Sequence, residues 1–234
     1  MNNFLRGVAQ AAAETFEMRG PVLEVGSYQV AGQESIADLR GLFPGKAFIG
    51  TDMRPGDGVD RIENVESLSF ADDCMGTVIA MNVFEHVEKF WLGFDEIQRV
   101  LRPDGVALIS CPFYFHIHDY PSDYWRFTPE ALDSLFHTAD AKILGWHGAK
   151  ARPANVWMVA FGKQYGSIDE SDRQRFHDRI KRYAHEPIRW SKTIRYNLCR
   201  IFVGRGNFAP YLDLERFDTK LSLAATADTK VKAA

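Results

Sequence analysis

The stretch Val22-Leu23-Glu24-Val25-Gly26-Ser27 is a short run of apolar and β-branched residues that ends at a glycine. Such a run predicts a buried strand, and the glycine predicts a tight turn from that strand into the next helix. At a turn of this kind a ligand can approach the backbone closely, and the first N–H groups of the helix are free to bind it. The stretch therefore predicts a ligand site at the end of the first strand.

Similar apolar runs recur along the chain, and stretches of helical period lie between them. The runs cover 47–51, 77–81, 105–110, 141–146 and 155–161, and the helical stretches cover 3–19, 31–42 and 88–101. A further helix is expected at Thr128-Pro129-Glu130, because threonine is a good N-cap and proline suits the first helical position. Strands that alternate with helices form a parallel sheet with right-handed crossovers. We therefore predict an α/β fold, Rossmann-like and doubly wound, with a seven-stranded, mostly parallel sheet.

The composition of the chain changes after about residue 164. Residues 1–164 hold an N-terminal helix within 1–19 and all of the predicted strands, whereas the chain from Tyr165 onward has 14 basic and 9 acidic residues. Two apolar stripes of helical spacing predict a basic, helical C-terminal extension over 165–222, and residues 223–234 read as a flexible tail. The stripes are Phe176, Ile180 and Tyr183, and then Trp190, Ile194, Leu198 and Ile201. We expect the second helix to pack on the domain or to form a homodimer.

Overall composition limits the class of protein. With 46% hydrophobic and 25% charged residues the chain is globular, and its net charge of −3 gives no overall reason to bind nucleic acid. No run of 18 apolar residues predicts a membrane span, and the first residues lack the basic and apolar regions of a signal peptide. Three widely spaced cysteines without a C-x-x-C pair suit a reducing compartment. We therefore expect a cytoplasmic protein.

Two acidic residues define the kind of ligand that the first turn would bind. Asp52 ends the second strand, 26 residues after Gly26, where a carboxylate can accept hydrogen bonds from both hydroxyls of a ribose. The dinucleotide fingerprint G-x-G-x-x-G is broken, because Tyr28 occupies its second glycine position. Glu24 is not needed to bind a pyrophosphate, but it suits a cofactor with an amino group and a sulfonium charge. The residues therefore disfavour NAD.

An ordered set of motifs resembles the class I S-adenosylmethionine-dependent methyltransferases of type 11. These motifs are Leu23-Glu-Val-Gly-Ser27, Gly50-Thr-Asp52, Glu66-Ser-Leu-Ser-Phe70, Met81-Asn-Val-Phe-Glu-His86 and Val100-Leu-Arg-Pro-Asp-Gly105. The resemblance covers residues 20–162. It implies that the last of the seven strands runs antiparallel to the others and that the cofactor is S-adenosylmethionine.

The resemblance also implies which residues bind the cofactor. Glu24 and Gly26 would lie near its methionine moiety, Asp52 would bind the ribose, and Asn64 with Val65 would lie beside the adenine. Family members often have aspartate where Asn64 stands, but an amide oxygen can still accept a hydrogen bond from the adenine amino group. The complete expected set is Glu24, Gly26, Ser27, Asp52, Met53, Asn64, Val65, Asn82, Val83 and His86.

The segment after the predicted fifth strand, residues 111–129, combines aromatic side chains with two histidines, two aspartates and an arginine. Its position predicts that it covers the acceptor pocket. The expected catalytic residues are His116 or His118 as general base, oriented by Asp119. The residues expected to shape the acceptor site are Tyr120, Tyr124, Trp125 and Arg126.

Two other interpretations of this segment remain open. It could be a lid that packs through its aromatic residues, with Arg126 paired to Asp123. The run His116-x-His118-Asp119 could also bind a metal, but the sequence shows no second cluster to complete such a site, so no metal is assigned. Residues 118–129 resemble a methyltransferase subgroup often encoded among bacterial surface-polysaccharide and secondary-metabolite genes, which points to sugar-like acceptors.

The sequence thus predicts a methyltransferase that transfers a methyl group from S-adenosylmethionine to a hydroxyl group of a small molecule, such as a sugar or natural product. An amine is the second choice of acceptor, and no nucleic acid or membrane span is expected. One alternative is an RNA or protein methyltransferase that docks through the basic C-terminal helices. Another is a non-catalytic module that only binds the cofactor.

Overall fold

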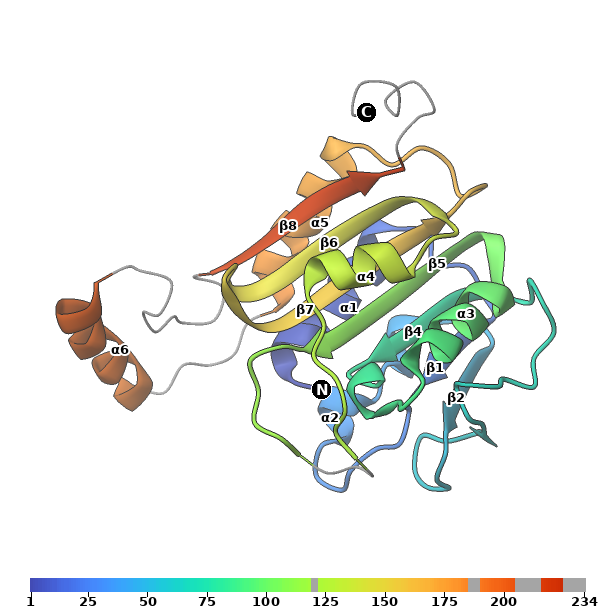
Figure 1. Ribbon diagram of the computed structural model, residues 1–234, viewed down its shortest axis with the longest axis horizontal. Coiled ribbons are helices and arrows are strands. Elements are labelled where there is room, and N and C mark those ends of the chain that lie inside the picture. The colour runs from blue at the N-terminus through green and yellow to red at the C-terminus, as the bar shows by residue number, and fades with distance from the viewer. Residues whose placement is uncertain (119–121, 185–189, 205–215, 225–234) are drawn as a thin grey trace.

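A computed structural model describes residues 1–118, 122–184, 190–204 and 216–224. Eight strands form one sheet in the order β3-β2-β1-β4-β5-β7-β6-β8 (Figure 1). The strands are β1 (Val22–Val25), β2 (Phe48–Asp52), β3 (Arg61–Ile62), β4 (Met75–Met81), β5 (Leu101–Pro112), β6 (Ala139–Ala149), β7 (Arg152–Gly162) and β8 (Phe217–Leu223). Strands β3, β2, β1, β4 and β5 pair in parallel, whereas β7 runs antiparallel to both β5 and β6. The predicted doubly wound α/β fold with an antiparallel last strand is confirmed.

Helices cover both faces of the sheet. They are α1 (Asn3–Thr15), α2 (Glu34–Ala37), α3 (Phe90–Val100), α4 (Pro129–Leu135), α5 (Glu170–Tyr183) and α6 (Trp190–Val203), with 3₁₀ turns at η1 (Arg40–Leu42) and η2 (Phe84–His86). Buried residues of α3 and α4 pack in the core on one face, and those of α1 and α5 pack in a second core on the other. In Figure 1, α3 and α4 lie in front of the sheet, and α1 and α5 lie behind it.

The C-terminal part of the chain differs from the predicted helical extension, because it also contributes a strand. Strand β8 pairs antiparallel with β6, from Phe217 opposite His147 to Leu223 opposite Ala141. The sheet therefore has eight strands where the sequence predicts seven. Between the C-terminal helices and the sheet edge, residues 205–215 lie outside the described part, as does most of the expected flexible tail.

Two helices are shorter than the sequence predicts. The first ends at Thr15, whereas helical spacing predicts it as far as residue 19. The stretch 31–42 is split into α2 and η1, because the Asp38 side chain accepts a hydrogen bond from the Arg40 N–H at 2.9 Å and ends the helical ladder. Arg6 also donates to the carbonyl of Ile36 at 3.3 Å, which ties this connection to α1.

The two C-terminal helices have different surroundings. In α5, Phe176 and Ile180 are fully buried against the sheet, as the amphipathic pattern predicts. In α6, the predicted stripe of Trp190, Ile194 and Leu198 is exposed. The expectation that this stripe packs on the domain is therefore not met by the described residues, because α6 extends away from the sheet (Figure 1).

Candidate active site

The turn after β1 has the backbone conformation that the sequence predicts. Gly26 has φ +75°, and its N–H and that of Ser27 donate to the Thr51 carbonyl at 2.7 and 3.0 Å. A Cβ atom on Gly26 would lie 2.5 Å from Cγ2 of Val83, so only glycine fits between β1 and the turn that follows β4. This contact brings the predicted cofactor residues Gly26 and Val83 side by side.

Glu24 is a buried acid in the middle of the sheet. Glu24 is the third residue of β1, and only 8% of its surface is exposed. Burial raises the pKa of Glu24 to about 8, and the guanidinium of Arg40 opposes this rise only in part. A cationic group that approached Glu24 would stabilise its charged form, so Glu24 fits the ammonium group of a cofactor.

The carboxyl end of β2 positions Asp52. Asp52 accepts a hydrogen bond from the Arg54 N–H at 3.0 Å, and the two side chains lie 3.7 Å apart. The Arg54 guanidinium lies 4.5 Å above the centre of the Tyr28 ring, and a Cβ on Gly56 would come within 2.3 Å of that ring. Tyr28 therefore packs under the turn after Asp52, which explains how a tyrosine replaces the second glycine of the dinucleotide fingerprint.

Four further predicted cofactor residues have contrasting positions. Met53 is 62% exposed beside Asp52, whereas the Val65 side chain is buried in the core and could reach a cofactor only through its backbone. Asn64 accepts a hydrogen bond from the Glu66 N–H at 3.0 Å through Oδ1. The Ser27 hydroxyl is buried next to the Gly50 backbone, so only the main chain of Ser27 could reach a cofactor.

The end of β4 turns sharply toward the predicted acceptor segment. Asn82 has φ +57°, and its Oδ1 accepts a hydrogen bond from the Ser110 hydroxyl at 2.9 Å. Its N–H donates to the Ser110 carbonyl at 2.9 Å. These bonds to β5 hold the strained residue in place, and η2 begins directly after Val83.

Glu85, which the sequence analysis did not select, is fully buried on η2. Its two carboxylate oxygens have no hydrogen-bond partner among the described residues. Burial raises the pKa of Glu85 to about 8, although the N–H of its own backbone and, less strongly, the positive α-amino group of Met1 lower it in part. The Glu85 carbonyl accepts the Tyr124 N–H at 2.7 Å, which attaches the acceptor segment to η2.

Two histidines meet beside Glu85. The rings of His86 and His118 have centroids 4.8 Å apart in an edge-on arrangement, and Nδ1 of His86 lies 2.8 Å from the Ser122 carbonyl oxygen. Burial is the main reason that the pKa of His86 is lowered. The second predicted base, His116, is exposed, and its ring lies 6.2 Å from that of His118.

Asp123 is the carboxylate that lies beside His118. His118 Nδ1 and Asp123 Oδ2 are 3.0 Å apart, and the Arg126 guanidinium holds the pKa of Asp123 well below its usual range. Asp119, the expected partner of His118, and Tyr120, an expected acceptor residue, lie outside the described residues. The ion pair of Arg126 with Asp123, expected for a lid, is present.

The rest of the acceptor segment presents aromatic side chains. Tyr124 and Trp125 are 46% and 37% exposed, and Trp125 Nε1 donates to the Val87 carbonyl at 3.0 Å. Arg126 also donates to the His116 carbonyl at 3.3 Å, so its guanidinium mainly fixes the shape of the loop. Tyr124 and Trp125 thus expose aromatic surface on the loop, whereas the guanidinium of Arg126 is bonded within it.

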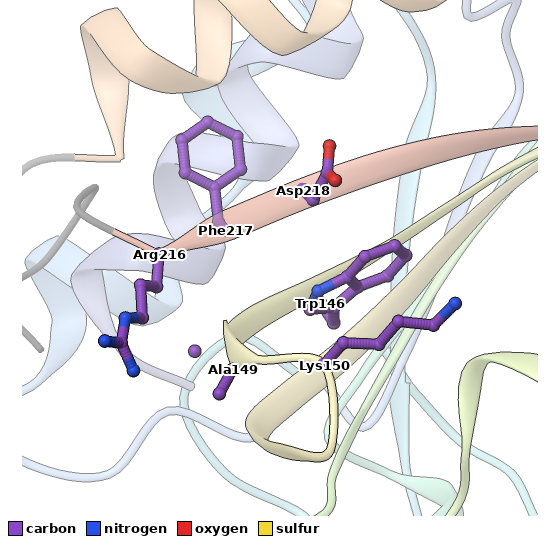
Figure 2. Close-up of a pocket in the computed structure, with 7 residues that line it drawn as sticks. Trp146, Ala149, Lys150, Arg216, Phe217 and Asp218 are labelled. Atoms are coloured by element: carbon purple, nitrogen blue, oxygen red, sulfur yellow. The ribbon is translucent and has the colours of Figure 1, made fainter. Parts of the chain in front are cut away.

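A shallow cavity of about 280 Å³ lies elsewhere, at the β6–β7 turn and the start of β8 (Figure 2). Trp146, Lys150 and Phe217 are among the residues that line it, and the Lys150 ammonium lies 5.5 Å from the centre of the Trp146 ring. None of the predicted cofactor or catalytic residues lines this cavity.

Within the described ranges, no helix is long and apolar enough to cross a membrane.

Comparison with known proteins places the chain among methyltransferases. Residues 45–109 match a family profile described as a methyltransferase domain, of type 11. A 44-residue segment is 46% identical to an uncharacterized methyltransferase from Mycolicibacterium vanbaalenii. That segment is 19% of this chain and spans 17% of the relative's length.

Solved structures of methyltransferases are also similar to the chain. One is an S-adenosylmethionine-dependent methyltransferase from Mesorhizobium loti, with 12% identity and a TM-score of 0.49, covering 68% of this chain and 98% of that one. Another, from Aquifex aeolicus, has 12% identity and a TM-score of 0.45 over 65% of this chain and 88% of the other.

The strand order and the turn at Gly26 define a class I methyltransferase fold. Within that class, residues 45–109 are similar to the type 11 family of methyltransferase domains. This family uses S-adenosylmethionine as its cofactor. Three features of the site fit this molecule: the buried acid Glu24 suits its ammonium group, the glycine turn at Gly26 suits an approach to the backbone, and the carboxylate of Asp52 suits its ribose.

Proposed function

We propose that the protein transfers the methyl group of S-adenosylmethionine to a hydroxyl group of a small molecule, such as a sugar or natural product. An amine is the second choice of acceptor. One observation carries the proposal: the ring of His118, on the loop after β5, lies beside the ring of His86, which is three residues after Val83, and Val83 borders the turn at Gly26. A hydroxyl acceptor must lose a proton, and imidazole is the side chain best suited to accept it near neutral pH.

Residues at the ends of β1 and β2 would bind the cofactor. Glu24 would face its ammonium group, the backbone at Gly26 would lie along its methionine moiety, and Asp52 would bind the ribose. Asn64 would contact the adenine. When bound, S-adenosylmethionine supplies the activated methyl group, so the protein mainly orients the acceptor and removes a proton.

The acceptor segment would supply the general base and the walls of the second pocket. His116 or His118 would accept the proton, and the nearby carboxylate of Asp123 would stabilise the protonated form of His118. Tyr124 and Trp125 would pack against the acceptor, since both expose aromatic surface on the same loop. Stacking of aromatic rings on the apolar face of a ring compound suits the proposed class of acceptor.

The first experiment tests cofactor binding. Thermal unfolding of the purified protein is followed with S-adenosylhomocysteine and, separately, with NAD. A ligand at a hundred times its Kd stabilises the folded state by about 2.7 kcal/mol, so only S-adenosylhomocysteine should raise the Tm of the wild type. Asp52→Ala should lose this shift, whereas the matched control Asp57→Ala, at an exposed neighbouring position, should keep it. A shift with NAD alone would overturn the proposal.

The second experiment tests transfer and its base. Radiolabelled S-adenosylmethionine is incubated with a panel of monosaccharides, nucleotide sugars and phenols, and product formation is measured. On any acceptor that reacts, His118→Ala or His116→Ala should lower turnover at least 100-fold, as expected for removal of a general base. His137→Ala, at an exposed position on another part of the surface, is the control. Full turnover in both His116→Ala and His118→Ala would exclude these residues as bases. If the wild type binds the cofactor but forms no product from any acceptor, the protein is better described as a binding module.

A further inference from the structure

The buried carboxylate of Glu85 has no use in the mechanism described so far. The Glu85 residue is 0% exposed, and both of its oxygens lack a hydrogen-bond partner among the described residues. Removing a carboxylate from water without a compensating partner is costly. A group that costs stability in this way, next to a candidate active site, indicates a ligand that Glu85 binds.

Two imidazoles lie within reach of that carboxylate. Glu85, His86 and His118 each offer one ligand atom, and these atoms all lie within 4.8 Å of one another. The Glu85 Oε1 atom is 3.8 Å from Nε2 of His86. Glu85 and His86 belong to η2, whereas His118 belongs to the loop after β5. The fold therefore brings together His86 and His118, which are 32 residues apart in the sequence.

The surroundings of the two histidines resemble the outer shell of a metal site. Nδ1 of His86 lies 2.8 Å from the Ser122 carbonyl oxygen, and a hydrogen bond from a protonated Nδ1 to this oxygen leaves the Nε2 lone pair free. His118 Nδ1 lies 3.0 Å from Asp123 Oδ2 without the alignment of a hydrogen bond, so the His118 ring can turn toward His86 at little cost.

The charges around the cluster leave one carboxylate for a cation. Asp123 is neutralised by its ion pair with Arg126, and the α-amino group of Met1 lowers the pKa of Glu85 without an ion pair between these two described residues. A divalent ion would compensate the charge of Glu85 and would also bind the two imidazoles.

We propose that Glu85, His86 and His118 bind a divalent transition-metal ion. One carboxylate and two imidazoles suit Zn²⁺, Fe²⁺, Co²⁺ or Mn²⁺, and this set leaves coordination positions open. Tetrahedral zinc with bonds of about 2.0–2.1 Å places its ligand atoms about 3.4 Å apart. Binding therefore requires the cluster to contract from its present spacing, and rotation of the His118 side chain is the simplest route.

The role of the ion in catalysis rests on the proposed function, whereas its binding does not. An open coordination position at this site would hold the acceptor hydroxyl and make it more acidic. The proton would pass from the hydroxyl to His116, which the metal leaves free. The acceptor oxygen would then form a bond to the methyl carbon, while the carbon–sulfur bond breaks and leaves its electron pair on sulfur.

Metal binding is tested on the full chain without acceptor or cofactor. The chelator-treated protein is titrated with Zn²⁺ by calorimetry and with Co²⁺ by visible absorption, which reports nitrogen and oxygen ligands directly. The wild type should bind one equivalent. Glu85→Gln and His118→Ala should each weaken binding at least 100-fold, whereas His137→Ala should bind like the wild type.

Two readouts keep the result interpretable. The Tm without metal shows whether each variant folds, and Glu85→Gln keeps the shape of the side chain. The shift in Tm with S-adenosylhomocysteine should be the same in Glu85→Gln as in the wild type, which separates loss of metal from loss of the cofactor site. Absence of a stoichiometric site in the wild type, or equal metal affinity in Glu85→Gln and the wild type, would overturn the proposal.

Discussion

At the scale of single residues, Glu24 gives the molecule a characteristic dependence on pH. Its pKa is about 8 in the folded protein because of burial and ordinary in the unfolded chain, so the folded state retains a proton that the unfolded state releases. Glu24 makes its full contribution to stability at pH values below the pKa that it has in the unfolded chain. This contribution declines as pH rises from about 4.5 to about 8 and is constant above that.

Glu24→Gln should remove this decline. The stability of the variant relative to the wild type should therefore increase between pH 5 and pH 8, by up to about 4 kcal/mol at 1.4 kcal/mol per pKa unit. The free energy of unfolding of both proteins is measured in urea at pH 5 and pH 8. Subtracting the wild-type value from that of the variant at each pH removes the contribution of other titrating groups, which both proteins share. A difference that does not change with pH would contradict the environment described for Glu24.

A second prediction at this scale concerns Gly26. Gly26→Ala combines an unfavourable positive φ with a contact of 2.5 Å to Val83, so we expect a loss of about 2–4 kcal/mol in the free energy of unfolding. Gly32→Ala is the matched control, because Gly32 also has positive φ but open space around its Cβ position. It should cost about 1 kcal/mol and keep the Tm shift with S-adenosylhomocysteine, which Gly26→Ala should lose. Equal losses in the two variants would mean that the contact with Val83 does not matter.

Individual residues were predictable where the signal is local. Thr128 caps α4 as expected, since its hydroxyl accepts the Ala131 N–H at 3.0 Å. The pairing of Arg126 with Asp123 spans three residues and was also foreseen. Glu85 was missed because its isolation depends on what surrounds it in space, although its place next to His86 at the end of a buried strand was a usable signal. The approach of Glu85 to His118 depends on the fold of the loop after β5.

At the scale of elements, α1 and α5 pack so closely that one position allows only glycine. A Cβ on Gly7 would lie 2.3 Å from the Cα of Ala184, at the end of α5. Gly7→Ala should therefore destabilise the protein by about 1–3 kcal/mol, even though alanine favours helix formation. Gly41→Ala, where nothing lies within 4 Å of the added atom, should change stability by less than about 0.5 kcal/mol. Urea unfolding of both variants measures the difference, and an unchanged or more stable Gly7→Ala would contradict the close packing.

The strands of the parallel core were predictable because burial on both faces gives continuous apolar runs. Strand β8 was not predicted, although Phe217, Thr219 and Leu221 alternate with polar residues along it. The alternation is short and lies 55 residues after β7, and nothing local shows that β6 has an unpaired edge. The split of the 31–42 stretch was also missed, because it depends on the side chain of Asp38.

At the scale of the whole molecule, the exposed stripe of α6 suggests how two copies would associate. Trp190 and Ile201 are 77% and 75% exposed on this helix, and a homodimer is the second of the two alternatives that the sequence leaves for it. We expect wild-type protein to sediment as a dimer at high concentration. Replacement of both residues by serine should halve the mass, because it removes apolar surface that association would bury.

Sedimentation equilibrium over a range of concentrations measures this association. The control replaces Trp91 and Leu92, which are exposed on α3, by serine and should leave the mass unchanged. A wild type that stays monomeric at every concentration, or a dimer that survives the α6 substitutions, would contradict a dimer through this helix.

The position of β8 at the end of the described chain also affects how the protein is made. During translation, β6 emerges long before its neighbour Phe217–Leu223, so its outer edge stays unpaired while the ribosome adds the intervening residues. An open strand edge is a site where another nascent chain can pair. The last strand of the sheet therefore protects the growing polypeptide from aggregation only late in synthesis, and messages truncated before this strand should yield inclusion bodies.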